Sequence, residues 1–192
     1  MIIYATKQTF ERYKLKLPHE LTPPINKIAE MIIEMESGNE LLEWGAKLFY
    51  FDGKKCIQVV NFASKFTLCL VDIKIKDLEL IGHIIIHYLL TLYEKEPPML
   101  RAIEKMAQDS PAFCFAKLTN RSAISTLNLI QRELLDDGRL FSTHLKDGIL
   151  HTIEINRFIN FKWIFGVRLM EKDGHVYAGD RFRELLLERY GN

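Results

Sequence analysis

Asp52 and Gly53 stand between two runs of residues that favour β-strands, and this pair constrains the fold more than any other feature of the sequence. The first run, KLFYF, ends at residue 51, and the second, KKCIQVVN, ends at residue 61. An Asp-Gly pair between two such runs is a strong signal for a tight β-hairpin. A third run, KFTLCLVDI at residues 65–73, extends the pattern. The sequence therefore predicts an antiparallel meander of three strands.

Helical patterns flank the meander on both sides. Residues 22–38 keep apolar positions at the helical period, with Thr22 as the expected N-cap. A longer apolar segment, about 76–96, stops at Pro97-Pro98, and we expect one long helix there, buried on two sides. Helices alternate with hairpins and not with regular βαβ units, so the expected class is α+β, an antiparallel meander sheet packed with several helices.

Shorter elements are expected toward both ends of the chain. A strand at 2–5 precedes a short helix that Thr6 caps. The segment 148–180 suggests short strands with a hairpin turn at Asp173-Gly174, and a last helix capped by Asp180 follows. No repeat or linker divides the chain, so we expect a single domain over 1–192. From about residue 139 the pattern weakens, which is consistent with a looser, β-rich subdomain.

Charge and cysteine content narrow the classes of function. The chain has 26 basic and 25 acidic residues, so no strong overall field attracts nucleic acid or a membrane. Cys56, Cys69 and Cys114 lie among apolar neighbours without a Cys-x-x-Cys spacing, which argues against a disulfide framework or a zinc ribbon. Reduced, buried thiols favour a cytoplasmic protein. The most hydrophobic run, residues 81–93, is shorter than the roughly 20 residues that span a bilayer, so we expect no membrane segment.

The corner TNRS at residues 119–122 is the best candidate for a site. An apolar run ends there and a helical pattern begins, so the corner predicts a strand followed by a capped helix with free N–H groups. Spaced i, i+4, i+7 and i+11, four side chains form one narrow polar stripe opposite the apolar side. These four residues are Arg121, Ser125, Asn128 and Arg132. With Asn120 and Ser122 at the helix start, they are the predicted binding residues. An arginine fork suits phosphate or carboxylate oxygens, whereas the plainer interpretation is a capped helix with a solvated face.

The histidines give weaker signals. His83 and His87 are four residues apart, a spacing that lets two imidazoles share a metal, but no third ligand follows in the sequence. We therefore interpret them as partly buried, hydrogen-bonded side chains and predict no metal site. His144 and His151 are the weak candidates for a catalytic base. Nucleotide-binding and nucleophile-elbow motifs are missing from the sequence, so we predict no cofactor.

Two segments resemble an uncharacterised bacterial family of small cytoplasmic proteins. They are KLFYFDGKKCIQVVN and KLTNRSAISTLN, in which Lys55, Cys56 and Asn120 to Ser122 occupy the shared positions together with Asn128. The chain departs from the family pattern at Ser125-Thr126, where Gly-Ser is more usual, and at Leu129, where an acidic residue is usual. The resemblance implies one bacterial domain, of a kind found on mobile elements, and implies no activity.

Three hypotheses of function remain open at this point. The first is a non-catalytic binding or regulatory protein that contacts nucleic acid or a partner protein through the helix face at 119–132. The second is a small enzyme acting on a phosphate-containing substrate, such as a nuclease, with His144 or His151 as the base. The third is an inhibitor or antitoxin-like protein. We favour the first, without an enzymatic activity, because the sequence carries no catalytic signature. The sequence does not specify an oligomeric state.

Overall fold

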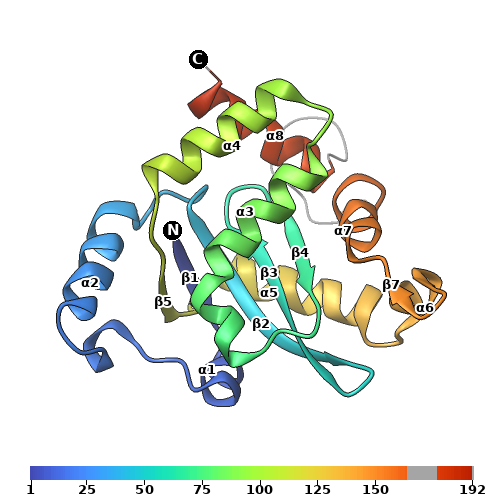
Figure 1. Ribbon diagram of the computed structural model, residues 1–192, viewed down its shortest axis with the longest axis horizontal. Helices are drawn as coiled ribbons and strands as arrows, with labels where there is room; N and C mark the ends of the chain where they lie inside the picture. Colours follow the sequence, from blue (N-terminus) through green and yellow to red (C-terminus); the bar gives the residue numbers. More distant parts are fainter. Residues whose placement is uncertain (164–176, 192) are drawn as a thin grey trace.

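The structure of the protein is a computed structural model that describes residues 1–163 and 177–191. A five-stranded sheet forms its centre (Figure 1). The strands are β1 (Ile2–Ala5), β2 (Glu43–Phe51), β3 (Lys54–Asn61), β4 (Thr67–Leu70) and β5 (Cys114–Lys117). They lie in the order β4-β3-β2-β1-β5. A separate hairpin is formed by β6 (Leu145–Lys146) and β7 (Ile149–Leu150). The α+β class is confirmed.

The predicted meander is present and is part of a larger, mixed sheet. Asp52 and Gly53 both have positive φ, 49° and 70°, which is the backbone of a tight hairpin turn whose twist matches the strands. β2 pairs antiparallel with β3, and β3 with β4. However, β1 lies parallel to both β2 and β5, so the expectation of a purely antiparallel sheet was wrong. The reason is the helical connections before β2 and β5, which carry the chain back to the same end of the sheet.

Eight helices surround the sheet among the residues described. They are α1 (Lys7–Tyr13), α2 (Ile25–Glu36), α3 (Ile81–Leu92), α4 (Pro97–Asp109), α5 (Arg121–Ile130), α6 (Arg139–Thr143), α7 (Thr152–Phe161) and α8 (Ala178–Tyr190). In Figure 1, α3 crosses the face of the sheet toward the viewer and α5 passes behind it. Thr6 caps α1 as predicted, accepting from the Thr9 N–H.

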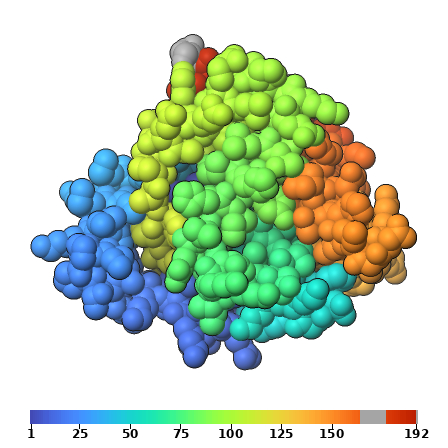
Figure 2. Space-filling model, in the orientation of Figure 1, coloured from blue at the N-terminus to red at the C-terminus, as the bar shows by residue number. Residues whose placement is uncertain are grey.

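The main core lies between the front face of the sheet and α3, α4 and α8. Trp44, Ala46 and Leu48 point to this face from β2 and are buried. Phe182 of α8 reaches the same cluster, with ring centroids 6.1 Å from Trp44 and 5.0 Å from Phe66. In Figure 2, the yellow-green segment that leads into β5 lies between α2 and α3.

The single long helix expected at 76–96 is divided in the structure. A 3-10 turn at Ile75–Leu80 leads into α3, which ends at Leu92, and α4 then begins at Pro97. The two prolines occupy the first turn of α4, where their missing N–H groups cost no helical hydrogen bond. α3 also buries one side only: Ile85 and Leu89 are fully buried, whereas both histidines of the helix are exposed.

The boundaries of two other helices differ from the sequence predictions. α2 begins at Ile25 and not at Thr22, whose carbonyl oxygen accepts from the Ile25 N–H. α8 begins at Ala178, so Asp180 lies in its first turn and pairs with Arg183 at 3.3 Å. The hairpin turn expected at Asp173-Gly174 falls outside the described residues.

The expectation of short strands after residue 148 was wrong for most of the described residues, because 152–161 form α7. Two asparagines explain how this helix is positioned. Asn156 Oδ1 accepts from the Cys69 N–H at 2.7 Å, and Asn160 Oδ1 accepts from the Thr67 N–H at 2.8 Å. Their amide nitrogens donate to the carbonyl oxygens of the same two residues. α7 therefore pairs with the free edge of β4 through side chains, in place of a further strand.

Candidate functional site

The helix start at the predicted corner is formed by Asn120. This residue has the extended backbone of an N-cap, and its Oδ1 accepts from the Ala123 N–H at 2.9 Å. The amide of Asn120 is therefore engaged in holding the end of α5, which is the plainer of the two roles considered for it. A strand, β5, precedes the corner as predicted, and Leu118 anchors the connection in a cluster with Ala123 and Leu127.

The polar stripe of Arg121, Ser125, Asn128 and Arg132 is exposed along its whole length. Ser122, beside it at the helix start, is exposed as well. The opposite side of α5 packs on β2 and β3, at Gly45 and Val60. A Cβ atom at Gly45 would lie 3.2 Å from Val60 Cγ1 and 3.4 Å from Ala123 Cβ, so the missing side chain lets the helix approach the sheet closely.

A lysine of the sheet reaches the middle of the stripe. Lys47 lies on β2, and its Nζ donates to Asn128 Oδ1 at 2.7 Å. Burial lowers the pKa of Lys47, whereas the carboxylate of Asp136 acts in the opposite direction. This bond fixes the amide of Asn128 so that its NH₂ group points away from the lysine. The stripe therefore presents an oriented donor and not a freely rotating side chain.

The two arginines of the stripe differ in their surroundings. Arg132 is on a π-helical turn, Gln131–Leu135, and its guanidinium bonds to Glu133 at 2.8 Å through both Nε and Nη2. Arg121 makes no ion pair with any residue that the structure describes. Arg121 is therefore the cation of the stripe whose charge is available to a partner.

A hollow of about 380 Å³ adjoins the start of α5, beside Thr119 and Asn120. Glu40 and Glu43 line it, and the mostly buried Glu43 carboxylate accepts from the Tyr4 hydroxyl at 2.8 Å and the Gly38 N–H at 3.2 Å. Burial and this carboxylate raise the pKa of Tyr4 to about 12. Two carboxylates repel an anion, so the hollow does not extend the helix start into a phosphate site.

His144 and His151 flank the β6–β7 hairpin, and only their backbones are joined. The His151 N–H donates to the His144 carbonyl oxygen at 3.0 Å. The His144 imidazole is engaged elsewhere, because its Nδ1 lies 2.7 Å from the Leu140 carbonyl oxygen, whereas His151 is exposed. Among the described residues no hydrogen bond or ion pair connects either imidazole to an arginine or a carboxylate. The geometry of an acid–base pair is not formed by these two side chains.

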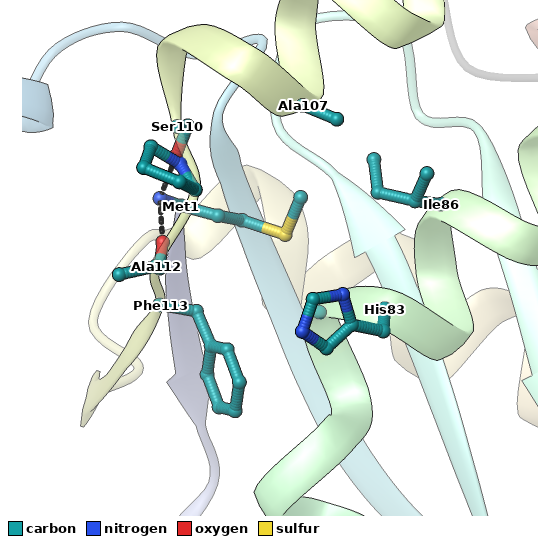
Figure 3. Close-up of a pocket in the computed structure, with 9 residues that line it drawn as sticks. Met1, His83, Ile86, Ala107, Ser110, Ala112 and Phe113 are labelled. Carbon is teal, nitrogen blue, oxygen red and sulfur yellow. Dashed lines mark hydrogen bonds between the residues drawn. The ribbon is translucent and has the colours of Figure 1, made fainter.

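A second hollow, of about 190 Å³, lies beside His83 (Figure 3). The amino group of Met1 is at its edge, where it donates to the Ala112 carbonyl oxygen at 2.9 Å and contacts Ser110 Oγ and Glu36. These polar groups bond to one another. The imidazole of His83 is therefore the ionisable side chain of the lining that has no partner among them. His83 and His87 are exposed and not partly buried as we expected.

Metal ligands and reactive thiols are not assembled in the part of the chain that the structure describes. No group of three or more His, Cys, Asp or Glu side chains there has the arrangement of a metal site. Cys56, Cys69 and Cys114 are free and buried, and burial raises the pKa of each thiol. None of the helices described is long and apolar enough to cross a membrane.

Comparison with known families decides where the chain belongs. A model of a domain of unknown function (DUF6933) matches residues 2–177. The chain belongs to this family. The match includes the sheet, the stripe and α7, and so extends well beyond the two segments on which the resemblance was based. A search of curated proteins gave no match to the chain.

Sequence reasoning missed Lys47 and Glu43, the two β2 residues that face the stripe and the hollow. Both lie more than 70 positions before α5, so no local pattern connects them with it. The signal that could have found them is the alternation of side chains along a strand. Glu43, Gly45 and Lys47 lie on one face of β2, and two charged residues on an otherwise apolar strand indicate that this face is partly exposed.

Proposed function

We propose that this DUF6933 member is a non-catalytic binding protein that docks a partner protein through the exposed stripe of α5. The observation that carries the proposal is the bond from Lys47 to Asn128, which fixes a polar side chain in the middle of an exposed helix face. An exposed asparagine has no need of a fixed amide for stability. A fixed donor on the same exposed helix face as an unpaired arginine is typical of a surface that recognises hydrogen-bonding groups.

A protein partner fits this surface better than nucleic acid. Proteins that bind nucleic acid neutralise many phosphates, and a contiguous set of cations supplies most of their affinity. Here Glu133 neutralises Arg132, and the carboxylates of Glu40 and Glu43 lie at the helix start. Arg121 and the partly buried Lys47 are the remaining cations of this surface. Two cations suit one carboxylate-bearing segment of a protein and not a polyanion.

The proposed interaction takes place in the cytoplasm. Three buried free thiols support a reducing compartment, since an oxidising one favours disulfides in small domains. An inhibitor or antitoxin-like role would use the same stripe, and the activity of the partner in the presence of the protein distinguishes that role from passive docking.

Charge reversal on the stripe tests the proposal. Tagged wild-type protein and the Arg121→Glu variant are incubated with an extract of the source organism, and retained proteins are identified by mass spectrometry. Arg101→Glu on α4 is the matched control, because it reverses an exposed arginine on the other side of the sheet. We expect one partner to be retained by the wild type and by Arg101→Glu and to be lost from Arg121→Glu, with all three proteins equally folded by circular dichroism.

Two results contradict the proposal. Retention of the same partner by Arg121→Glu excludes the stripe as the contact. Co-purification of nucleic acid, seen as a high ratio of absorbance at 260 nm to that at 280 nm and released steeply by salt, excludes a protein partner in favour of phosphate binding.

A further inference from the structure

The outer edge of β5 has no hydrogen-bond partner among the described residues, in contrast to the opposite edge of the sheet, although α2 and the 3-10 turn Pro18–Glu20 lie beside it. The Cys114 N–H donates to the Met1 carbonyl oxygen and the Leu118 N–H to the Ala5 carbonyl oxygen, so alternate residues of β5 bond to β1. Phe113, Phe115 and Lys117 therefore direct their N–H and C=O groups away from the sheet. No residue in the described ranges pairs with these backbone groups. At the other edge, Asn156 and Asn160 satisfy the equivalent groups of β4.

Two neighbouring hollows lie beside this edge, and we name them together the edge groove. It consists of two hollows of about 370 and 480 Å³ that share Lys14 and Leu15 in their lining. The larger hollow includes Lys117, and the smaller includes Phe113 and Phe115. The smaller hollow lies between α2 on one side and the 3-10 turn Ile75–Leu80 on the other.

The walls of the edge groove are apolar and partly exposed. Ile25 and Ile28 of α2 form one wall, with 55% and 48% of their surface exposed, and Ile75, at 51%, belongs to the opposite wall. Side chains of an added strand alternate between the two faces of a sheet, so every second one would meet each wall. An apolar groove beside unpaired strand groups is the arrangement that accepts an extended peptide.

Charge at the rim indicates the composition of the occupant. Lys14, Lys16 and Lys117 are exposed, and none of them forms an ion pair with a described residue. Three acidic residues also line the groove: Glu11 lies 3.8 Å from Lys7, Glu20 accepts from the Leu17 N–H at 2.7 Å, and Glu79 is exposed on the wall that carries Ile75. Lysines without an ion pair to a described residue outnumber such carboxylates in the lining, so an acidic segment complements the groove better than a second copy with the same excess of lysine.

We propose that an extended segment of a partner protein, apolar at its centre and acidic at its ends, adds as a sixth strand to the edge of β5. Backbone hydrogen bonds to Phe113, Phe115 and Lys117 give the pairing, the two isoleucine-bearing walls hold the central side chains, and the lysines hold the ends. This inference is independent of the stripe on α5, since the two surfaces use different residues.

The probe for this proposal is a fluorescein-labelled peptide of three valines flanked on each side by two glutamates. Its binding is followed by fluorescence polarisation and by hydrogen exchange of the Phe115 and Lys117 amides, which should become protected. A peptide of the same sequence with N-methylated valines keeps the side chains and loses the backbone donors. We expect it to bind at least tenfold more weakly, and replacement of the glutamates by lysines to have an effect of similar size.

Two pairs of variants locate the contact on the protein. Lys117→Pro removes an outward N–H and the charge, whereas Lys117→Ala removes the charge alone, so the proline variant should bind the peptide several-fold more weakly than the alanine variant. Ile28→Glu should weaken binding at least tenfold, whereas Met35→Glu, at an exposed position of α2 outside the groove lining, should not. Arg121→Glu should leave peptide binding unchanged, so failure of the stripe proposal and failure of this one are separate results.

Several outcomes overturn the proposal. They are absence of saturable binding at millimolar peptide, equal affinity for the N-methylated peptide, and equal affinity of the Lys117→Pro and Lys117→Ala variants. A wild-type dimer in light scattering that Lys117→Pro converts to a monomer overturns it in favour of a second copy as the occupant.

Discussion

Asn120 and Asn128 lie on the same segment, and their amides act on different parts of the molecule. The Asn120 side chain bonds to a backbone N–H of its own helix, which is a stability role. The Asn128 side chain bonds to a lysine of the sheet and remains exposed. At the scale of single residues, the corner that the sequence singled out therefore combines a helix cap with a presented surface, and substitution can separate the two.

Substitution of the cap tests the first role. Asn120→Ala should lower the free energy of unfolding by about 1 kcal/mol, because the Ala123 N–H loses its acceptor at the helix start. Asn120→Asp retains an acceptor oxygen and should unfold near the wild-type midpoint. Urea denaturation followed by circular dichroism measures both. If alanine and aspartate have the same effect, the hydrogen bond at 2.9 Å does not stabilise the helix.

The success of sequence prediction at the scale of elements depended on how local the determining interactions are. The hairpin at Asp52-Gly53 was predictable because the turn residues themselves adopt the required positive φ. The Thr6 cap and the corner at Asn120 were predictable for the same reason. The stripe could be placed on an exposed face from helical spacing alone, but its bond to Lys47 could not.

α7 could not be predicted, because its position depends on atoms remote in the sequence. TIEINRFIN contains several β-branched residues that favour a strand. Asn156 and Asn160 bond to Cys69 and Thr67, which are 87 and 93 positions earlier in the chain. No local signal indicates that two asparagines at helical spacing match alternate residues of a strand edge. The tertiary interaction therefore outweighs the local preference.

Removal of one of these asparagines tests the edge pairing. Asn156→Ala leaves the buried N–H and C=O of Cys69 without partners and should lower the free energy of unfolding by on the order of 3 kcal/mol. Arg157→Ala on the same helix is the matched control, because it removes only a partly exposed contact to Glu94 at 3.9 Å. We expect the control to change stability by less than about 1 kcal/mol. Similar values for the two variants in urea denaturation would mean that water satisfies the strand edge.

At the scale of the whole molecule, the two edges of the sheet differ in whether their outward backbone groups are hydrogen-bonded. One edge is closed by α7 through side-chain amides, and the backbone groups of the other have no hydrogen-bond partner among the described residues and lie between apolar walls. Open edges invite association, and proteins usually cover or charge them. The exposed lysines beside β5 are such a charge, and they favour an acidic segment as the partner. This asymmetry is the physical basis for expecting a specific partner strand at β5.

The three cysteines offer a test of whether the molecule unfolds as one unit. Cys56 and Cys69 lie in the cluster that contains Phe141 and Ile159, whereas Cys114 lies in a separate cluster under α2. Burial raises the pKa of all three thiols, that of Cys114 to about 11, so little reactive thiolate is present in the folded protein at pH 8. In the unfolded chain the thiol pKa is about 8.5, and each cysteine becomes reactive.

We expect pulsed alkylation with iodoacetamide, read by mass spectrometry of each cysteine peptide, to give one common urea midpoint that coincides with the midpoint measured by circular dichroism.

The same difference in thiol pKa makes the free energy of unfolding fall as pH rises above about 8.5, because the unfolded thiols release protons there and the folded ones do not. Replacement of Cys114 by alanine should reduce this loss without changing the midpoints of Cys56 and Cys69 relative to each other. Alkylation of Cys114 at lower urea than the other two would show that β5 and α2 open independently, which bears directly on how a partner strand gains access to the edge groove.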